Sequence, residues 1–232
     1  MHGVLLLDKP VGLSSNLALQ KVRSALGRPK AGHTGTLDPL ASGLLSICIG
    51  EATKFSQFLL DSDKSYDALV RLGMVSSTGD AEGKLEVSGN PDVSQAQVRD
   101  ALSGFVGAMD QVPPMYSALK MAGRPLYEYA RAGVEVPRQT RNIFINTIEL
   151  QDFKDSVVAF SVSCSKGTYI RTLAEDLGRV LGCGAYLAGL RRTRIGPFNL
   201  EKAYSLTDLE SLGPVGAGEK LLPIDSFLGE LP

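Results

Sequence analysis

Residues 31–45 read AGHTGTLDPLASGLL, and little else in the chain is as dense in conformationally special residues. Three glycines in this run allow backbone conformations that other residues avoid. Pro39 fixes its own φ angle and favours an extended conformation at Asp38, the one acid in the stretch. The apolar run Leu44–Ile49 follows and predicts a buried strand. A single carboxylate on a shaped loop beside a core strand is a placement typical of catalytic residues.

The same loop also has a purely structural interpretation, because Asp-Pro and Thr-Gly pairs are ordinary turn formers. The longer pattern favours the catalytic one. Seven segments spread over nearly the whole chain closely resemble the TruB family of pseudouridine synthases. They read DKPVGLSS, GHTGTLDPLASGLL, LLDSDKSYDA, PPMYSALK, LYEYARAG, CSKGTYIRTLAEDLG and LLPIDS.

This resemblance implies an enzyme that isomerises a specific uridine in the T-loop of tRNA, usually called uridine-55, to pseudouridine. It implies that Asp38 is the nucleophile. It makes Tyr66 the residue that stacks on the target base and a candidate general base, and Arg171 the partner of the acid. The motifs also imply substrate-binding or supporting roles for Lys9, His33, Lys166, Tyr169 and Leu190. Among these, His33 would fill the space left by the flipped base, Leu190 would line the pocket, and Lys9 with Pro10 would support the site.

The resemblance further implies an α+β fold with a large mixed sheet flanked by helices. We expect residues 1–232 to form the catalytic domain, with an inserted segment at about 111–141 that grips RNA. Family members usually add a small RNA-binding domain after the LLPIDS segment. Because this chain stops at Pro232, that domain is expected to be absent and RNA affinity to be weaker than usual for the family.

The chemistry is consistent with these residue types. The reaction cuts the N-glycosidic bond, rotates uracil and joins its C5 to the ribose, so the base must first leave its stack. Stacking on Tyr66 would stabilise the extruded base by about 1–3 kcal/mol. The carboxylate must be ionised to attack, and an arginine favours that form. The sequence leaves open whether Asp38 attacks C6 of uracil or C1′ of the ribose.

Composition is that of an ordinary globular protein, with 44% hydrophobic and 21% charged residues. No apolar run approaches the roughly 20 residues that a membrane-spanning helix needs, and the N-terminus lacks the basic region of a signal peptide. Three cysteines form no CxxC pair, and Cys48 and Cys164 lie in apolar runs that predict reduced core thiols. We therefore expect a cytoplasmic protein with no membrane partner.

The net charge of −1 argues weakly against a nucleic-acid partner. The distribution of charge points the other way, because two basic clusters stand out. The first contains Lys120, Arg124, Arg131, Arg138 and Arg141, and the second contains Arg191, Arg192 and Arg194. Tyrosines at 116, 127 and 129 interleave with the first cluster, a composition suited to RNA. A solvated basic face and core tyrosines remain the competing interpretation.

Other catalytic classes lack their motifs. The chain has two histidines, His2 and His33, and no clustered ligands for zinc. It has no GxSxG elbow and no GxGxxG after a strand. The loop Ser76–Lys84 fails the phosphate-loop pattern, because only three residues separate its last two glycines and Leu85 stands where Ser or Thr should be. We expect no metal and no cofactor, and a site built on a carboxylate, an arginine and tyrosines.

Local patterns predict the surrounding elements. Strands are expected over 4–7, 44–49, 66–72, 158–164 and 185–190, and helices over about 14–26, 54–60, 94–102, 126–132 and 170–181. If the backbone is still extended after residue 164, Tyr169 and Arg171 share one face. The end, Gly213–Pro232, is rich in Gly and Pro and is expected to be a loose tail.

Two alternatives to the main hypothesis stay open. One is a guide-RNA-dependent synthase of the same superfamily, which would work beside protein partners; the TruB resemblance implies instead that tRNA is the substrate and that no protein partner is obligatory. The other is a non-catalytic tRNA-binding or tRNA-folding protein. The complete set of Asp38, Tyr66 and Arg171 argues against the second, because binding alone needs no nucleophile.

Overall fold

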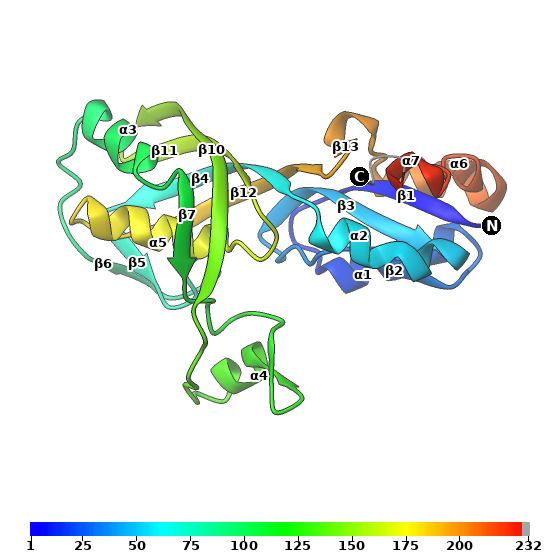
Figure 1. Cartoon of the computed structure of the whole chain (residues 1–232), viewed down its shortest axis with the longest axis horizontal. Helices are drawn as coiled ribbons and strands as arrows, with labels where there is room; N and C mark the ends of the chain where they lie inside the picture. The colour runs from blue at the N-terminus through cyan, green and yellow to red at the C-terminus, as the bar shows by residue number, and fades with distance from the viewer. Residues whose placement is uncertain (229–232) are drawn as a thin grey trace. The chain divides into compact units, whose positions relative to one another are not determined.

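The computed structural model describes residues 1–228 and has the expected α+β architecture, a large and mostly antiparallel sheet flanked by helices (Figure 1). The chain divides into two compact units. The first contains Met1–Tyr66 and the chain from Arg191 onward, and the second contains Asp67–Leu190. Strands β4 (Lys64–Leu72) and β12 (Ala185–Ile195) carry the chain from one unit to the other.

In the first unit, β1 (Gly3–Lys9) pairs antiparallel with β3 (Ala41–Ile49), and β2 (Ala31–His33) also pairs with β3. The short β13 (Phe198–Asn199) pairs with the end of β12. The helices are α1 (Ser15–Ala25), α2 (Ser56–Asp61), α6 (Leu206–Gly218) and α7 (Asp225–Leu228), with 3-10 turns η1 (Gly50–Phe55) and η2 (Leu200–Lys202). The strand 4–7 and the helix 14–26 of the sequence analysis are thereby confirmed.

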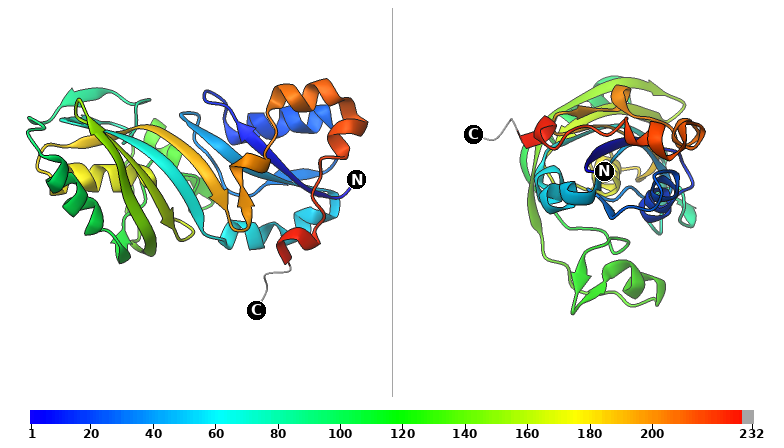
Figure 2. Two further views of the ribbon diagram at one scale, coloured as in Figure 1. Left: turned by 90° about the horizontal axis from the view of Figure 1, so that it is seen from above. Right: turned by 90° about the vertical axis from the view of Figure 1, so that its right-hand side faces the viewer.

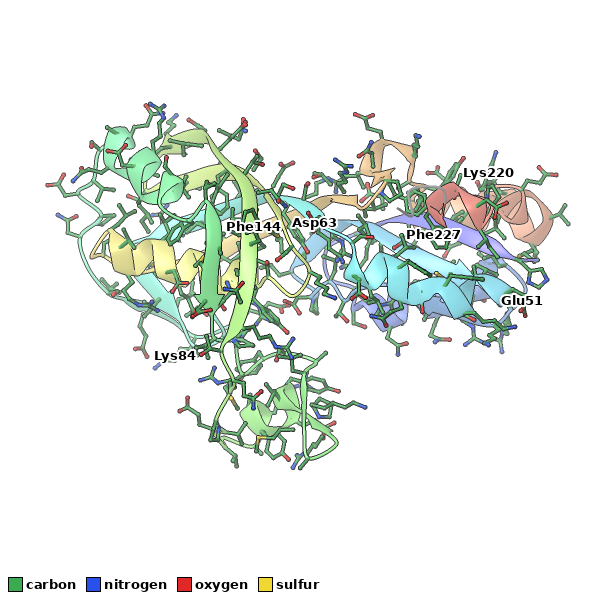
Figure 3. The ribbon with its side chains drawn as sticks, viewed as in Figure 1. Glu51, Asp63, Lys84, Phe144, Lys220 and Phe227 are labelled. Atoms are coloured by element: carbon green, nitrogen blue, oxygen red, sulfur yellow. The ribbon has the colours of Figure 1, made fainter. Side chains whose placement is uncertain are left out.

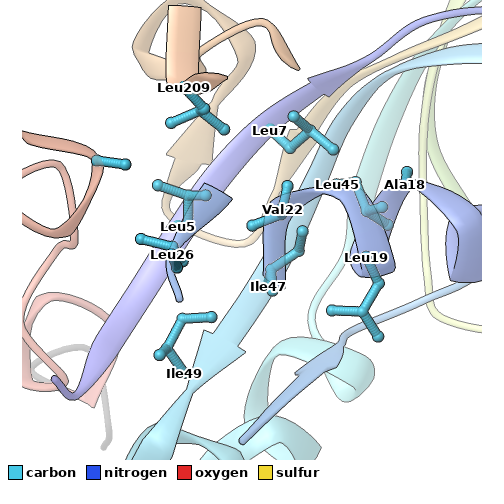
Figure 4. Close-up of a cluster of buried hydrophobic side chains, with 11 residues drawn as sticks. Leu5, Leu7, Ala18, Leu19, Val22, Leu26, Leu45, Ile47, Ile49 and Leu209 are labelled. Carbon is cyan, nitrogen blue, oxygen red and sulfur yellow. The ribbon is translucent and has the colours of Figure 1, made fainter. Parts of the chain in front are cut away.

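The core of this unit has two layers because alternate residues of β1 point to opposite faces. Leu5 and Leu7 pack against one side of the unit, where α1 and α6 lie side by side (Figures 2 and 4). Val4 and Leu6 pack on the other side, with Phe198 and Phe227. All four β1 side chains are at most 1% exposed. A strand buried on both faces reads as a continuous apolar run, as Val4–Leu7 does.

In the second unit the strand order is β12, β4, β11 (Val157–Cys164), β10 (Arg141–Lys154) and β7 (Gly107–Gln111). Buried and half-buried residues alternate along β11, as the sequence predicts. On β10, Ile143 and Ile145 are buried while Phe144 between them is 48% exposed (labelled in Figure 3). The helices are α3 (Gln95–Ser103) and α5 (Ile170–Val180), and β5 (Met74–Ser76) forms a small hairpin with β6 (Leu85–Val87).

The segment between β7 and β10 has only short elements: β8 (Lys120–Met121), β9 (Arg124–Pro125) and α4 (Leu126–Arg131). Figure 1 shows that α4 and its flanking loops extend past the ends of β7 and β10. The chain leaves α4 through Gly133 at φ +70°, a left-handed conformation that favours glycine. The predicted helix 126–132 is confirmed within one residue.

The expected loose tail at Gly213–Pro232 is wrong over the described residues. Helix α6 begins in a capping box between Ser205 and Asp208 and buries Leu209 against α1. Gly213 has a φ of +64° and Pro214 restarts the helix after this kink, which is why Gly and Pro occur inside a helical segment. Residues 229–232 of the expected tail lie outside the described residues. Within 1–228, no helix is both long and apolar enough to cross a membrane.

We expect native protein to resist thiol reagents. Cys48, Cys164 and Cys183 are at most 2% exposed, and none of them is in a disulfide. Burial raises the pKa of Cys48 to about 11, so at pH 8 only roughly one Cys48 in 1,000 is thiolate, the reactive form. Labelling of Cys48, followed by mass spectrometry, should be at least ~100-fold slower in buffer than in denaturant. Fast labelling of Cys48 in folded protein would contradict this placement.

Candidate active site

The Asp38 loop joins β2 to β3 and is clamped on both sides of the acid. The hydroxyl of Ser15 accepts from the Leu37 amide at 2.7 Å and donates to the Leu37 carbonyl at 2.9 Å. The Gly12 amide donates to the Pro39 carbonyl at 2.7 Å. Ser15 at the start of α1 and Gly12 in the turn before it thus hold the residues on either side of Asp38, so the Asp38 side chain projects from a fixed stretch of backbone.

Lys9 supports the turn that leads into α1. Its side chain is completely buried, and its ammonium donates to the carbonyls of Pro10 at 2.9 Å and Leu13 at 2.7 Å. A buried ammonium is stable only when such acceptors satisfy it. Lys9 therefore anchors the segment whose amides and hydroxyls hold the Asp38 loop.

His33 lies on β2 opposite Ile47, and so on a short strand rather than in the loop. Burial lowers the pKa of His33, and the positive charge of Arg192 lowers it further. Its Nδ1 is buried without a hydrogen-bond partner among the described residues. The ring is therefore neutral at physiological pH and suited to packing against another ring.

Tyr66 lies near the start of β4, where buried residues alternate with more exposed ones, and its side chain is 9% exposed. The neighbouring buried cation, Lys64, closes the end of α2 by donating to the carbonyls of Leu59, Leu60 and Ser62 at 2.6–3.1 Å. Lys64 thus fixes the start of β4 two residues before Tyr66.

The second basic cluster is not a free surface patch. Arg192 is 1% exposed, and Arg191 donates to the Asp8 carboxylate at 2.7 Å; Arg194 alone is exposed. The competing interpretation of a solvated basic face is wrong for Arg192. Strand β12 continues to Ile195, and Arg192 is buried within it. Burial lowers the pKa of Arg192, while the adjacent Tyr66 opposes this shift. The guanidinium stays charged, since arginine starts from so high a value.

Arg171 is buried in the second unit, in the first turn of α5. It donates to the carbonyls of Thr78 at 3.1 Å and Tyr116 at 2.5 Å, and its Nη1 lies 3.7 Å from Oδ2 of Asp80. Asp80, 2% exposed, also accepts from the hydroxyl of Thr78 at 2.6 Å and from the Glu82 amide at 3.1 Å. Sequence reasoning missed Asp80. The available signal was the position of Asp80 in a turn-rich loop, because an aspartate there often accepts a hydrogen bond from the backbone amide two residues later, as Asp80 does from Glu82.

Tyr169 occupies the N-cap position of α5, and its backbone is extended there. The amide group of Gln111 accepts from the Tyr169 amide at 2.7 Å and donates to its carbonyl at 3.1 Å. Because the helix begins at Ile170, the extended backbone does not reach Arg171, and the argument that these two residues share a strand face fails. Lys166 is exposed in the turn before, and Leu190 is half-buried on β12.

The predicted residues thus divide into two sets. Lys9, His33, Asp38 and Tyr66 belong to the first unit, and Lys166, Tyr169, Arg171 and Leu190 belong to the second. Within their own units, Lys9 of the first set and Tyr169 and Arg171 of the second are held by polar contacts to backbone or side-chain groups.

Comparison with known proteins places the chain in a family. Residues 23–170 match the model described as "TruB family pseudouridylate synthase (N terminal domain)", and residues 171–228 match that of the "tRNA pseudouridylate synthase B C-terminal domain".

The chain belongs to the TruB family.

Relatives in this family are similar over the whole chain. A tRNA pseudouridine synthase B of Aromatoleum aromaticum is 56% identical over 232 residues, which are 100% of this chain and 75% of that protein. The same-named protein of Dechloromonas aromatica is 53% identical over 100% of this chain and 78% of its own. Among solved structures, a chain of a Cbf5–Nop10–Gar1 complex matches with a TM-score of 0.79 and 31% identity. That match covers 99% of this chain but only 62% of the other, less than two thirds.

In this TruB chain, three arginines of the first basic cluster contact neighbouring residues of their own segment. The guanidinium of Arg124 lies 4.8 Å from the centre of the Tyr129 ring, and that of Arg131 lies 5.3 Å from the Tyr127 ring. Arg138 is half-buried and donates to the Pro113 carbonyl at 3.1 Å. Such cation–π pairs hold both partners at the surface. Neither tyrosine is a core residue, since both are only half-buried.

No group of three or more His, Cys, Asp or Glu side chains within residues 1–228 is arranged to hold a metal ion.

Proposed function

We propose that this chain is a tRNA pseudouridine synthase that isomerises uridine-55 in the T-loop of tRNA. The observation that carries the proposal is identity of 53–56% along the whole chain to proteins named tRNA pseudouridine synthase B. The string around Asp38 is complete, and its backbone is clamped by Ser15 and Gly12. We further propose that the protein acts in the cytoplasm, on tRNA, without an obligatory protein partner.

The catalytic roles are those that the resemblance to the TruB family implies, and each suits the chemistry of its residue. Asp38 is the only acid of the loop and supplies the ionised carboxylate that attacks the nucleoside. Arg171 is the cation that favours this ionised form. Tyr66 stacks on the extruded base, and its phenol is the candidate base that removes the proton from C5 after the new carbon–carbon bond has formed.

The atoms balance without any co-reactant. The C1′–N1 bond breaks, uracil turns, and a C1′–C5 bond forms. The proton on C5 then leaves, and N1 gains one, so that the product is an isomer of the substrate. Asp38 acts transiently in either route, by adding to C6 or to C1′, and is regenerated.

The supporting residues have roles that match their burial. His33, whose neutral ring is set on β2, fills the place of the flipped base. Lys166, which is exposed, is suited to a phosphate contact, whereas Tyr169 and Leu190 are suited to packing on the base and ribose. Lys9, completely buried, supports the α1 turn instead of contacting RNA.

The segment between β7 and β10 is proposed as the RNA grip. Arg124, Arg131 and Arg141 are exposed there. We expect tRNA affinity to fall roughly 10- to 100-fold between 50 and 200 mM salt, because three or four phosphate contacts release that many counterions. Changing these three arginines together to Gln should weaken binding and flatten the salt dependence, as measured by filter binding over a salt series.

The matched control is a variant that loses three positive charges outside this segment. Arg28, Arg99 and Arg179 are exposed outside this segment, and their triple Gln variant should bind tRNA almost as the unmodified chain does. Equal effects of the two triple variants would show that only net charge matters and would exclude the segment as the grip.

The decisive experiment mixes the purified chain with unmodified tRNA, without other protein or RNA, and assays for pseudouridine. Product at position 55 supports the proposal. Product only after a guide RNA and partner proteins are added would favour the guide-dependent alternative, and tight binding without product would favour a tRNA-folding protein.

A further inference from the structure

Arg192 is a charged residue that the proposed mechanism does not use. Its side chain is 1% exposed and is the largest among the fully buried side chains in residues 1–228. Removing a guanidinium from water is unfavourable unless its hydrogen bonds are replaced by well-placed partners. The position of those partners therefore indicates what this residue does.

The partners of Arg192 lie on the two sides of the Asp38 loop. Its Nε donates to the Leu44 carbonyl at 2.8 Å, and its Nη2 donates to the Gly35 carbonyl at 3.1 Å. Gly35 precedes Asp38 by three residues and Leu44 follows it by six. One rigid guanidinium thus joins both limbs of the loop that carries the proposed nucleophile.

Arg192 explains the glycine at position 43, which lies near the start of β3 just after the loop. A Cβ on Gly43, which has a φ of +98°, would lie 2.3 Å from the Arg192 carbonyl oxygen and 2.8 Å from its amide nitrogen. A Cβ on Gly35 would make an ordinary van der Waals contact with Nη1, at 3.5 Å, so its φ of +94° and not Arg192 favours glycine there. The backbone at Gly43, in contrast, passes so close to the backbone of Arg192 that no side chain fits between them.

Other proposed site residues are also next to this guanidinium. The Tyr66 side chain is near enough to affect the ionisation of Arg192, and the charge of Arg192 in turn affects His33. These three residues and Asp38 all belong to the first unit. A single fixed charge thus borders three segments that carry proposed site residues: β2, the Asp38 loop and β4.

We infer that Arg192 is a positioning residue, which holds the Asp38 loop in the arrangement that the reaction needs without contacting the substrate. The inference rests on the proposed function for its catalytic part. Lysine is not expected to replace this arginine, because its ammonium is a point charge on a flexible stem and lacks the rigid planar fork that fixes Nε and Nη2 on carbonyls at the two sides of the loop.

The test compares Arg192→Lys and Arg192→Met with Arg194→Lys, a control on the same strand whose side chain is exposed. Three quantities are measured: the single-turnover rate of pseudouridine formation at saturating enzyme, the Kd for tRNA, and amide hydrogen exchange of the free protein. Both Arg192 variants should lose about 100-fold in rate, the scale of a misplaced catalytic group, while Kd changes less than about threefold. Hydrogen exchange should rise over residues 32–44 only.

Each other result would overturn the inference. A folded Arg192 variant with near-normal rate, or with unchanged exchange over residues 32–44, would show that the guanidinium does not position the loop. Faster exchange throughout the first unit, with a collapsed melting temperature in both variants, would make Arg192 a general stabiliser. If the unmodified chain forms no pseudouridine, the proposed function fails separately, and hydrogen exchange still decides whether Arg192 holds the loop.

Discussion

Asp38→Asn is expected to abolish pseudouridine formation while tRNA affinity stays close to that of the unmodified chain. A neutral amide cannot attack carbon as a carboxylate does, so turnover should fall by at least about 10³-fold. The change keeps the shape of the side chain. The loop is clamped through Ser15, Gly12 and backbone groups, so the fold should survive.

The experiment measures turnover and tRNA Kd on the same preparation. Asp100→Asn, on the exposed face of α3, serves as the control for losing one acid and should behave as the unmodified chain. More than a few per cent of normal turnover in Asp38→Asn would remove this residue from the role of nucleophile.

Arg171→Lys should lose most of the catalytic rate, by about 10²-fold or more, and keep much of the tRNA affinity. The arginine reaches the carbonyls of Thr78 and Tyr116 and approaches Asp80. A point-like ammonium cannot satisfy these groups and also pair with another carboxylate in a bidentate manner. Because the site is buried, partial loss of the network should also lower the free energy of unfolding by about 1–3 kcal/mol.

Arg179→Lys is the matched control, since Arg179 lies on the same helix with its side chain 76% exposed. Single-turnover rates and thermal melts on the same samples decide between roles. An unchanged rate in Arg171→Lys rules out a catalytic role, and a collapsed melting temperature would make the residue structural.

Elements with local signals could be predicted from the sequence. Helix α3 carries its capping box in Ser94 and Gln97, and both of its hydrogen bonds are present. Strand β11 shows its alternation in eight consecutive residues. Both predictions are correct because a capping box depends only on residues within one helical turn, and the alternation depends only on residues within one strand. Helix α6 was not predicted because Gly213 and Pro214 are residues that usually end a helix. What stabilises α6 is its burial against α1, which is far away in the sequence.

The candidate site was predictable only in part, for the same reason. The family motifs pointed to Asp38, Tyr66 and Arg171, and their catalytic roles stay predictions. The groups that hold these residues were not apparent, because Arg192, Asp80 and Gln111 have ordinary local surroundings. A buried arginine bonded to two carbonyls 148 and 157 residues earlier in the chain leaves no short-range pattern.

The discontinuity of the first unit has a consequence for the order of events on the ribosome. Gly35 is made 157 residues before Arg192, its hydrogen-bond partner. At a typical synthesis rate, roughly 8–30 s pass between them, and all of Asp67–Leu190 is synthesised in that interval. The second unit therefore has its whole sequence synthesised before the first unit gains the buried cation that bonds to both sides of its loop. We expect the nucleophile to reach its final setting only after Arg192 has left the ribosome, by which time the whole of the second unit has emerged.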